Sequence, residues 1–144
     1  MTITEAKEEL RSIRKLDKEL KAIEREHDQL RAEVYNIHAT DYRADKVDGG
    51  KPRSFVDKLE RLEDCRHKCN ERWDMLIETR TALRAKIDKV DDYVYRAILI
   101  DYYISQNTWK SVCVNLGYSW KQMHRYHNKA LIAYALANTK DDIE

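Results

Sequence analysis

Glycine and proline are scarce in this chain of 144 residues, which contains three glycines and one proline. Gly49 and Gly50 are adjacent, and Pro52 follows them closely. Turns between strands depend on these residue types, whereas a composition rich in Glu, Lys, Arg, Leu and Ala favours long helices. Charged residues make up 37% of the chain. The composition therefore predicts an all-α fold.

Long apolar runs are also missing. Nowhere do about eighteen apolar residues follow one another, as a membrane span requires. The opening residues, MTITEAKEELRS, contain no apolar signal core. Three cysteines without a secretory leader favour reduced thiols. We therefore expect a cytoplasmic protein that neither enters a membrane nor is exported.

The residue patterns that usually carry catalysis or metal binding are absent as well. No cysteine has a matching histidine and acid, and there is no glycine-rich phosphate loop. On a helix, Cys65 and Cys69 share a face but His67 points elsewhere, and two ligands are too few for a metal site. His124 and His127 are equally poor ligands, and we expect His127 at the edge of a packed face. The sequence predicts no enzyme, no cofactor and no metal.

Two apolar stripes occupy the first 90 residues, in helices predicted over about 4–38 and 54–90. A capping signature at Thr4 begins the first helix, and its stripe continues if His27 takes one polar seam position, paired across to the second helix. The second stripe continues if Arg66 and Arg80 are seam positions. The apolar residues of the first stripe are Ile13, Leu16, Leu20, Ile23, Leu30, Val34 and Ile37. Those of the second stripe are Phe55, Leu59, Leu62, Cys69, Trp73, Leu76, Leu83, Ile87 and Val90.

A loop predicted over 39–53 separates the stripes, so a long antiparallel helical hairpin over 1–90 is the simplest arrangement. The stripes could instead pair between two chains as a homodimer, and the sequence leaves this open. Arg66 and Arg80 favour closure within one chain, because unpaired charges are costly in a symmetric seam and the first helix offers acids to meet them.

A helix-turn-helix pattern lies in the predicted C-terminal three-helix bundle, which spans 91–138 and precedes a tail at 139–144. The first helix of this bundle carries YVYRAILIDYYI. Thr108 can cap the next helix, Gly117 ends it where a positive φ is often needed, and Ser119 can cap the last one.

Acidic residues are absent from Thr108 to Leu131, where four Lys or Arg occur in a chain of net charge +1. The last helix, predicted over about 119–131, has one apolar side and one polar, basic side. Such a recognition helix enters the major groove, where Gln122 could bind adenine and Arg125 guanine, while lysines hold phosphates. The predicted DNA-binding residues are Lys110, Ser119, Trp120, Lys121, Gln122, His124, Arg125, Asn128 and Lys129.

Several short motifs follow one another here: Tyr95-Arg96, Leu99, Tyr103-Ile104, Thr108-Trp109, Leu116-Gly117-Tyr118-Ser119, and His127 with Ala130-Leu131. In this order they resemble the C-terminal region of a family of small proteins from temperate phages of Gram-positive bacteria. That region looks like region four of bacterial sigma factors and is similar to ArpU- and RinA-type late transcription activators. The resemblance implies a phage- or prophage-encoded transcription regulator in the bacterial cytoplasm, with double-stranded DNA and, by analogy, RNA polymerase as partners.

The sigma positions that face DNA fall on Trp120, Lys121, Gln122, His124, Arg125 and Lys129. This chain has His or Trp where those helices usually carry Arg or Glu, so the resemblance does not transfer a target sequence. Two other functions compete with DNA-dependent regulation. The long stripes suit a coiled-coil interaction protein that binds a host or phage partner without contacting DNA. A small terminase-like packaging component also joins a helix-turn-helix to a helical hairpin, usually with the DNA-binding part first.

Overall fold

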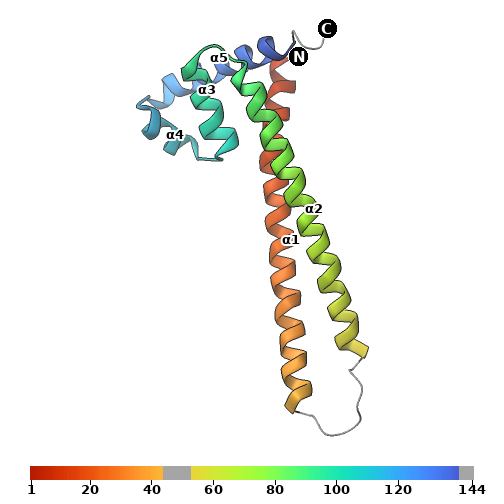
Figure 1. The fold of residues 1–144 in the computed structure, drawn as a ribbon. Helices are drawn as coiled ribbons and strands as arrows, with labels where there is room; N and C mark the ends of the chain where they lie inside the picture. The colour runs from red at the N-terminus through yellow and green to blue at the C-terminus, as the bar shows by residue number, and fades with distance from the viewer. Residues whose placement is uncertain (44–52, 140–144) are drawn as a thin grey trace. The chain divides into compact units, whose positions relative to one another are not determined.

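The computed structural model describes residues 1–43 and 53–139, and the side chains of residues 1–36 and 55–139. The helices labelled in Figure 1 are α1 (Ile3–Arg43), α2 (Arg53–Asp88), α3 (Tyr93–Leu99), α4 (Trp109–Leu116) and α5 (Trp120–Thr139). A π-helical turn, η1 (Ile100–Ile104), directly follows α3. No strand occurs among these residues, so the all-α prediction is confirmed. None of the helices described is long and apolar enough to cross a membrane.

The ends of α1 and α2 differ from the predicted ones. Thr2, rather than Thr4, caps α1: its hydroxyl accepts from the Glu5 N–H at 3.1 Å, and the Glu5 carboxylate accepts from the Thr2 N–H at 2.8 Å. This reciprocal capping box satisfies two of the backbone donors that a helix start leaves unpaired. Both ends of the predicted loop at 39–53 are helical, because α1 continues to Arg43 and α2 begins at Arg53. The rest of that loop, and the predicted tail beyond Thr139, lie outside the described residues.

The chain forms two compact units, to which α1 and α2 both contribute. The bundle unit comprises Met1–Leu16 and Leu76–Glu144, and the paired-helix unit comprises Asp17–Met75. The sequence predicted one boundary, after residue 90, whereas the two units meet between residues 16 and 17 and between residues 75 and 76. The start of α1 and the end of α2 group with α3, α4 and α5 because all of these segments except α4 supply side chains to one core.

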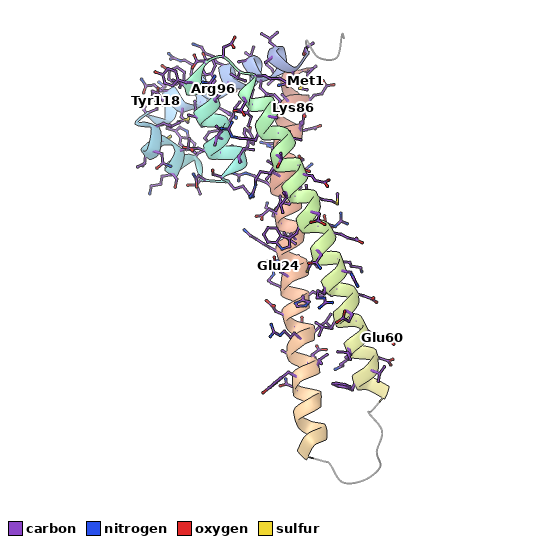
Figure 2. All side chains as sticks on the ribbon, viewed as in Figure 1. Met1, Glu24, Glu60, Lys86, Arg96 and Tyr118 are labelled. Atoms are coloured by element: carbon purple, nitrogen blue, oxygen red, sulfur yellow. The ribbon has the colours of Figure 1, made fainter. Side chains whose placement is uncertain are left out.

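Tyr103, at the C-terminal end of η1, is a fully buried member of that core. Burial of each large apolar side chain contributes roughly 1.5–3 kcal/mol. Near the core, Lys86 of α2 forms an ion pair with Glu9 of α1 (Figure 2 labels Lys86). The buried residues of the core are Ala6, Leu10, Ile87, Val90, Leu99, Tyr103, Ala130, Leu131, Tyr134 and Ala135.

Asp92 and Arg96 define the joint between α2 and α3. The Asp92 carboxylate caps α3 by accepting from the N–H groups of Val94, at 2.8 Å, and of Tyr95, at 3.4 Å. The Arg96 guanidinium, labelled in Figure 2, donates to the carbonyls of Val90 and Asp91, just past the end of α2. These bonds satisfy backbone groups that the two helix ends would otherwise leave unpaired.

In the paired-helix unit, α1 and α2 lie antiparallel, as their polar contacts show. The Trp73 indole N–H donates to the Glu24 carboxylate at 3.0 Å (Figure 2 labels Glu24). Ion pairs join Glu19 to Arg72 at 3.0 Å and Glu33 to Lys58 at 3.5 Å. The acids of the first helix therefore meet cations of the second, though not the two arginines that the stripe pattern singled out.

The seam of this unit uses Cys65 where the stripe pattern predicted Arg66. Cys65 is 5% exposed and its thiol lies 3.6 Å from the Ile23 carbonyl, whereas Arg66 is exposed and pairs with Glu63 on its own helix. Both choices alternate spacings of three and four between Leu62 and Cys69, so spacing alone could not decide. The free energy of burial decides between the two residues, because moving a thiol from water into the seam costs far less than moving a guanidinium.

Two further seam predictions need correction. His27 is half-buried, and the ion-pair contact it makes is with the neighbouring Asp28, at 3.9 Å, rather than across to α2. Leu59 and Trp73 are 37% and 44% exposed, respectively, so they lie at the margin of the seam. Arg80, in the bundle unit, is half-buried, and its Nε atom is buried without a hydrogen-bond partner in the described structure.

Candidate nucleic-acid interface

α4 and α5 are joined by a three-residue turn whose geometry follows from local sequence. The Thr108 hydroxyl caps α4 by accepting from the Ser111 N–H at 3.2 Å. Gly117 ends α4 with φ 73° and ψ 29°, the left-handed conformation that glycine adopts without a Cβ penalty. Its N–H donates to the Cys113 carbonyl at 2.9 Å, and the Tyr118 N–H donates to the same oxygen at 3.1 Å. The predicted start and stop signals of this helix are confirmed.

Ser119 and Gln122 form a capping box at the start of α5. The Ser119 hydroxyl accepts from the Gln122 N–H at 3.3 Å, and the Gln122 side-chain oxygen accepts from the Ser119 N–H at 3.2 Å. The cap predicted at Ser119 is therefore present. The carbonyl oxygen of the Gln122 amide is turned back to the helix start, so it is not free to pair with a base edge in this conformation.

A small apolar cluster holds α4 and α5 against α3. Its buried members are Ile98 of α3, Val112 of α4 and Met123 of α5, which are 0%, 0% and 1% exposed, respectively. Tyr118, labelled in Figure 2, lies with its ring centroid 5.0 Å from that of Tyr126 and packs on the same cluster. One side of α5 is therefore fixed by packing, which leaves its opposite side to solvent.

His127 lies inside the bundle, not at the edge of the packed face as the sequence predicted. It is 6% exposed, and its Nε2 atom forms a 2.8 Å hydrogen bond with the Tyr103 hydroxyl. Burial, together with the nearby Lys7, His124 and Arg11, lowers the pKa of His127 from 6.5 to about 4. Burial also raises the pKa of Tyr103, so both groups are uncharged near neutral pH. A period-3.6 pattern cannot distinguish a buried His from a partly exposed one.

Aromatic rings extend from this buried pair toward the surface. Tyr102 stacks on Trp109 with ring centroids 3.7 Å apart, and Trp109 meets His127 edge-on at 4.5 Å. His124 lies 5.9 Å from Trp109 and 4.6 Å from Trp120. Trp120 is 56% exposed and packs edge-on against His124, so it lies outside the core.

Arg14 of α1 connects the start of the chain to the segment that precedes α4. Its guanidinium donates to the carbonyls of Tyr102, at 3.0 Å, and Asn107, at 3.2 Å, and lies 4.2 Å from the centroid of the Tyr102 ring. The segment between Tyr102 and Asn107 contains the end of the π-helical turn and Gln106, whose φ of 57° is unusual for a residue other than glycine. Sequence reasoning missed Arg14, because no short motif relates it to residues so far along the chain.

All nine predicted DNA-binding residues are exposed. Lys121, Arg125 and Asn128 lie on the side of α5 opposite its buried residues, as does Lys129. Trp120 and His124 lie on the flank next to buried His127, where His124 meets Trp109. No acidic residue occurs from Trp109 to Thr139. Lys129 lies 5.9 Å from the centroid of the Tyr126 ring, at the margin of the packed cluster. The solvent-facing surface of α4, of the turn and of α5 therefore carries all nine predicted residues: Lys110 on α4, Ser119 in the turn, and Trp120, Lys121, Gln122, His124, Arg125, Asn128 and Lys129 on α5.

The two cysteines of the seam do not share their surroundings with the nearby His67. Cys65 and Cys69 are buried and His67 is exposed. Their spacing predicted the shared face of the two cysteines and the different direction of His67, but not the burial of Cys65 in the seam. Burial raises the pKa of both thiols, which disfavours the thiolate that a metal requires. No cluster of three potential metal ligands occurs in the part of the chain that the structure describes.

The fold and this surface define an all-α protein in which two capped helices, joined by a tight turn, present a basic face. The chain belongs to the DUF1492 family of proteins of unknown function, whose family model matches residues 36–135. That match includes α2, α3, α4 and most of α5. No curated protein and no solved structure matches the chain.

Proposed function

We propose that this protein is a DNA-binding transcription regulator in which α5 enters the major groove. The observation that carries the proposal is the acid-free, exposed face of α5, on a helix whose start is fixed by a capping box and whose opposite side is buried. Side chains near the start of such a helix can contact base edges, while basic residues hold phosphates. Rigid placement matters because hydrogen bonds to base edges require defined geometry.

Arg125 is the strongest candidate for a base contact on this face. It is exposed on α5, one turn past Lys121, and its forked guanidinium suits the two acceptors of a guanine edge. Gln122 is a weaker candidate than its position in the sequence suggests, because its side-chain oxygen already accepts from Ser119. Lys110, Lys121 and Lys129 are exposed cations suited to phosphate contacts.

Binding to short duplexes tests the proposal. Duplexes of random sequence and duplexes enriched by selection would be titrated at several salt concentrations, by gel shift or fluorescence anisotropy. We expect affinity to fall steeply with salt, since each phosphate neutralised adds about −0.9 to the slope of log K against log salt. The double variant Lys121→Ala/Arg125→Ala should weaken binding about tenfold or more and flatten that slope.

A matched control removes two cations elsewhere. Arg61→Ala/Lys68→Ala changes the net charge equally, at exposed positions of α2 in the paired-helix unit. This variant should bind as the wild type does. If wild-type protein shifts no duplex even at low salt, or if both double variants bind equally well, α5 is not a recognition helix and the proposal is wrong.

The likeness to phage regulators refines the proposal. The motifs from Tyr95 to Leu131 support a phage- or prophage-encoded protein that acts like sigma region four at a promoter, in a bacterial cytoplasm. RNA polymerase would then be a second partner. Co-purification of polymerase with the tagged wild-type protein, persisting after nuclease treatment, would support this refinement, and its loss on nuclease treatment would count against it.

A second function has one observation in its favour. In the paired-helix unit, Val56, Leu59, Trp73 and Met75 of α2 are each 37–44% exposed, which is much apolar surface for a helix already paired with α1. Such residues suit contact with another protein, including a second copy of this chain. Light scattering of wild-type protein and of Trp73→Ala/Met75→Ala would test self-association. A wild-type mass above that of one chain, falling to the monomer mass in the variant, would support it, and a monomeric wild type would count against it.

A further inference from the structure

The start of α1 carries a basic row on the side that meets the segment preceding α4. Lys7, Arg11 and Arg14 follow at spacings of four and three, so they lie above one another on one side of the helix. Glu9 lies elsewhere on the helix, where it pairs with Lys86 of α2. All of these residues belong to the bundle unit.

The contacts of Arg14 place the basic row beside the helix-turn-helix, and the electrostatics of His127 agree with that placement. Arg14 is fixed by its bonds to the Tyr102 carbonyl, within η1, and to the Asn107 carbonyl, shortly before α4. Lys7 and Arg11 both lie near enough to His127 of α5 for their charges to disfavour its protonation. His124, one turn earlier on α5, acts on His127 in the same way. The basic row therefore lies on the side of α1 that faces His127 of α5 and the segment preceding α4.

The members of the row differ in what they can bind. The Arg14 guanidinium is occupied by two carbonyls and an aromatic ring, so it serves as a structural link. Lys7 and Arg11 take part in no ion pair within the described part of the chain, and Arg11 is exposed. These two cations contribute no evident stability to the fold, and their charge is available to an anionic partner.

We propose that Lys7 and Arg11 form a second DNA contact, which holds the phosphate backbone beside the groove that α5 enters. This inference rests on the proposed function, because it assumes that α5 lies in the major groove. Phosphate strands run along both edges of that groove, whereas Lys121, Arg125 and Lys129 are on α5 itself. A row on the neighbouring helix would fix the orientation of the protein on the duplex without contributing sequence preference.

The test compares Lys7→Ala/Arg11→Ala with wild-type protein on a duplex of random sequence and on a selected duplex. Loss of two phosphate contacts should reduce the magnitude of the salt slope by roughly 2, and should weaken binding to both duplexes by about the same factor, on the order of tenfold near physiological salt. The control Arg61→Ala/Lys68→Ala should leave both quantities unchanged. Arg11→Lys, which retains the cation, should retain most of the affinity.

The outcomes separate this inference from the proposed function. If wild-type protein binds and Lys121→Ala/Arg125→Ala weakens binding while Lys7→Ala/Arg11→Ala keeps the wild-type slope, the second contact does not exist but the recognition helix does. An equal loss in the control variant would show that net charge, not position, is responsible, and would also overturn the inference. If wild-type protein binds no duplex, both proposals fail. Circular dichroism of each variant checks that α1 remains helical, and Arg11→Glu, which should weaken binding more than Arg11→Ala, gives a second measurement at an exposed position.

Discussion

The bundle unit and the paired-helix unit are built from the same two long helices but are stabilised differently. Among the residues whose burial is described, the apolar side chains buried in the paired-helix unit are Leu20, Phe55, Cys65 and Cys69. The bundle unit buries a far larger set, drawn from α1, α2, α3, η1, α4 and α5. A helix with one neighbour can bury only one narrow stripe, whereas a helix with several neighbours buries most of its circumference.

The polar contacts of the two units also differ in how deeply they are buried. The paired-helix unit relies on ion pairs such as Glu19 with Arg72, whose side chains are 46% and 37% exposed. Pairs that exposed contribute little, typically about 0–1 kcal/mol. The bundle unit instead contains the buried Tyr103–His127 hydrogen bond, which is costly to break because neither partner can turn to water. The basic surface is thus carried by the more densely packed unit, which suits the proposal that this surface positions side chains on DNA.

The largest effect should come from truncating matched leucines in the two units. Leu99 and Leu20 are 0% and 1% exposed, so Leu99→Ala and Leu20→Ala remove the same groups at the same burial. We expect Leu99→Ala to cost roughly 4–5 kcal/mol and Leu20→Ala roughly 2–3 kcal/mol, because two helices can close on a cavity more easily than a multi-helix core can. Urea unfolding followed by circular dichroism measures both. Equal losses would show that the units pack equally well.

The contrast between the units also explains how much of the fold could be predicted from the sequence. Periodicity alone identified the two long helices, and caps at Thr108 and Ser119 with the stop at Gly117 identified α4 and α5, because these signals are local. The exposed face of α5 followed from the same spacing. The choice of Cys65 over Arg66 could not be made from spacing, since both fit, and it required the transfer costs of the two side chains to be compared.

Contacts between segments far apart in the chain could not be predicted from the sequence. Arg14 meets Tyr102 and Asn107 across 88 and 93 residues, and no motif relates them. The burial of His127 depends on Tyr103, which a π-helical turn shifts relative to a regular helix. The start of α1 could be assigned to the bundle unit only when its packing with α5 was known.

Acid should destabilise the bundle unit specifically. The pKa of His127 is about 4 in the folded protein and about 6.5 when unfolded, so the unfolded state binds more protons between these values. Stability is therefore complete above about pH 6.5 and falls as the pH is lowered toward 4, by up to about 3 kcal/mol. His127→Gln, which cannot titrate there, should lose less stability over this range. Urea unfolding at pH 7, 5.5 and 4.5 would show this, and identical pH profiles for the two proteins would contradict it.

The smallest effect concerns Gln122, where a structural role and a DNA contact can be separated. Gln122→Ala removes one half of the capping box and should cost about 0.5–1 kcal/mol of stability. Gln122→Glu keeps an acceptor for the Ser119 N–H and adds a negative charge near the positive end of the helix dipole, so stability should be unchanged or slightly raised. The same Glu places a negative charge on the basic face of α5, so DNA affinity should fall by roughly tenfold if that face meets phosphates. Thermal unfolding and duplex titration on both variants measure the two effects separately. If Gln122→Glu is stable and binds as tightly as wild-type protein, this end of α5 does not approach DNA.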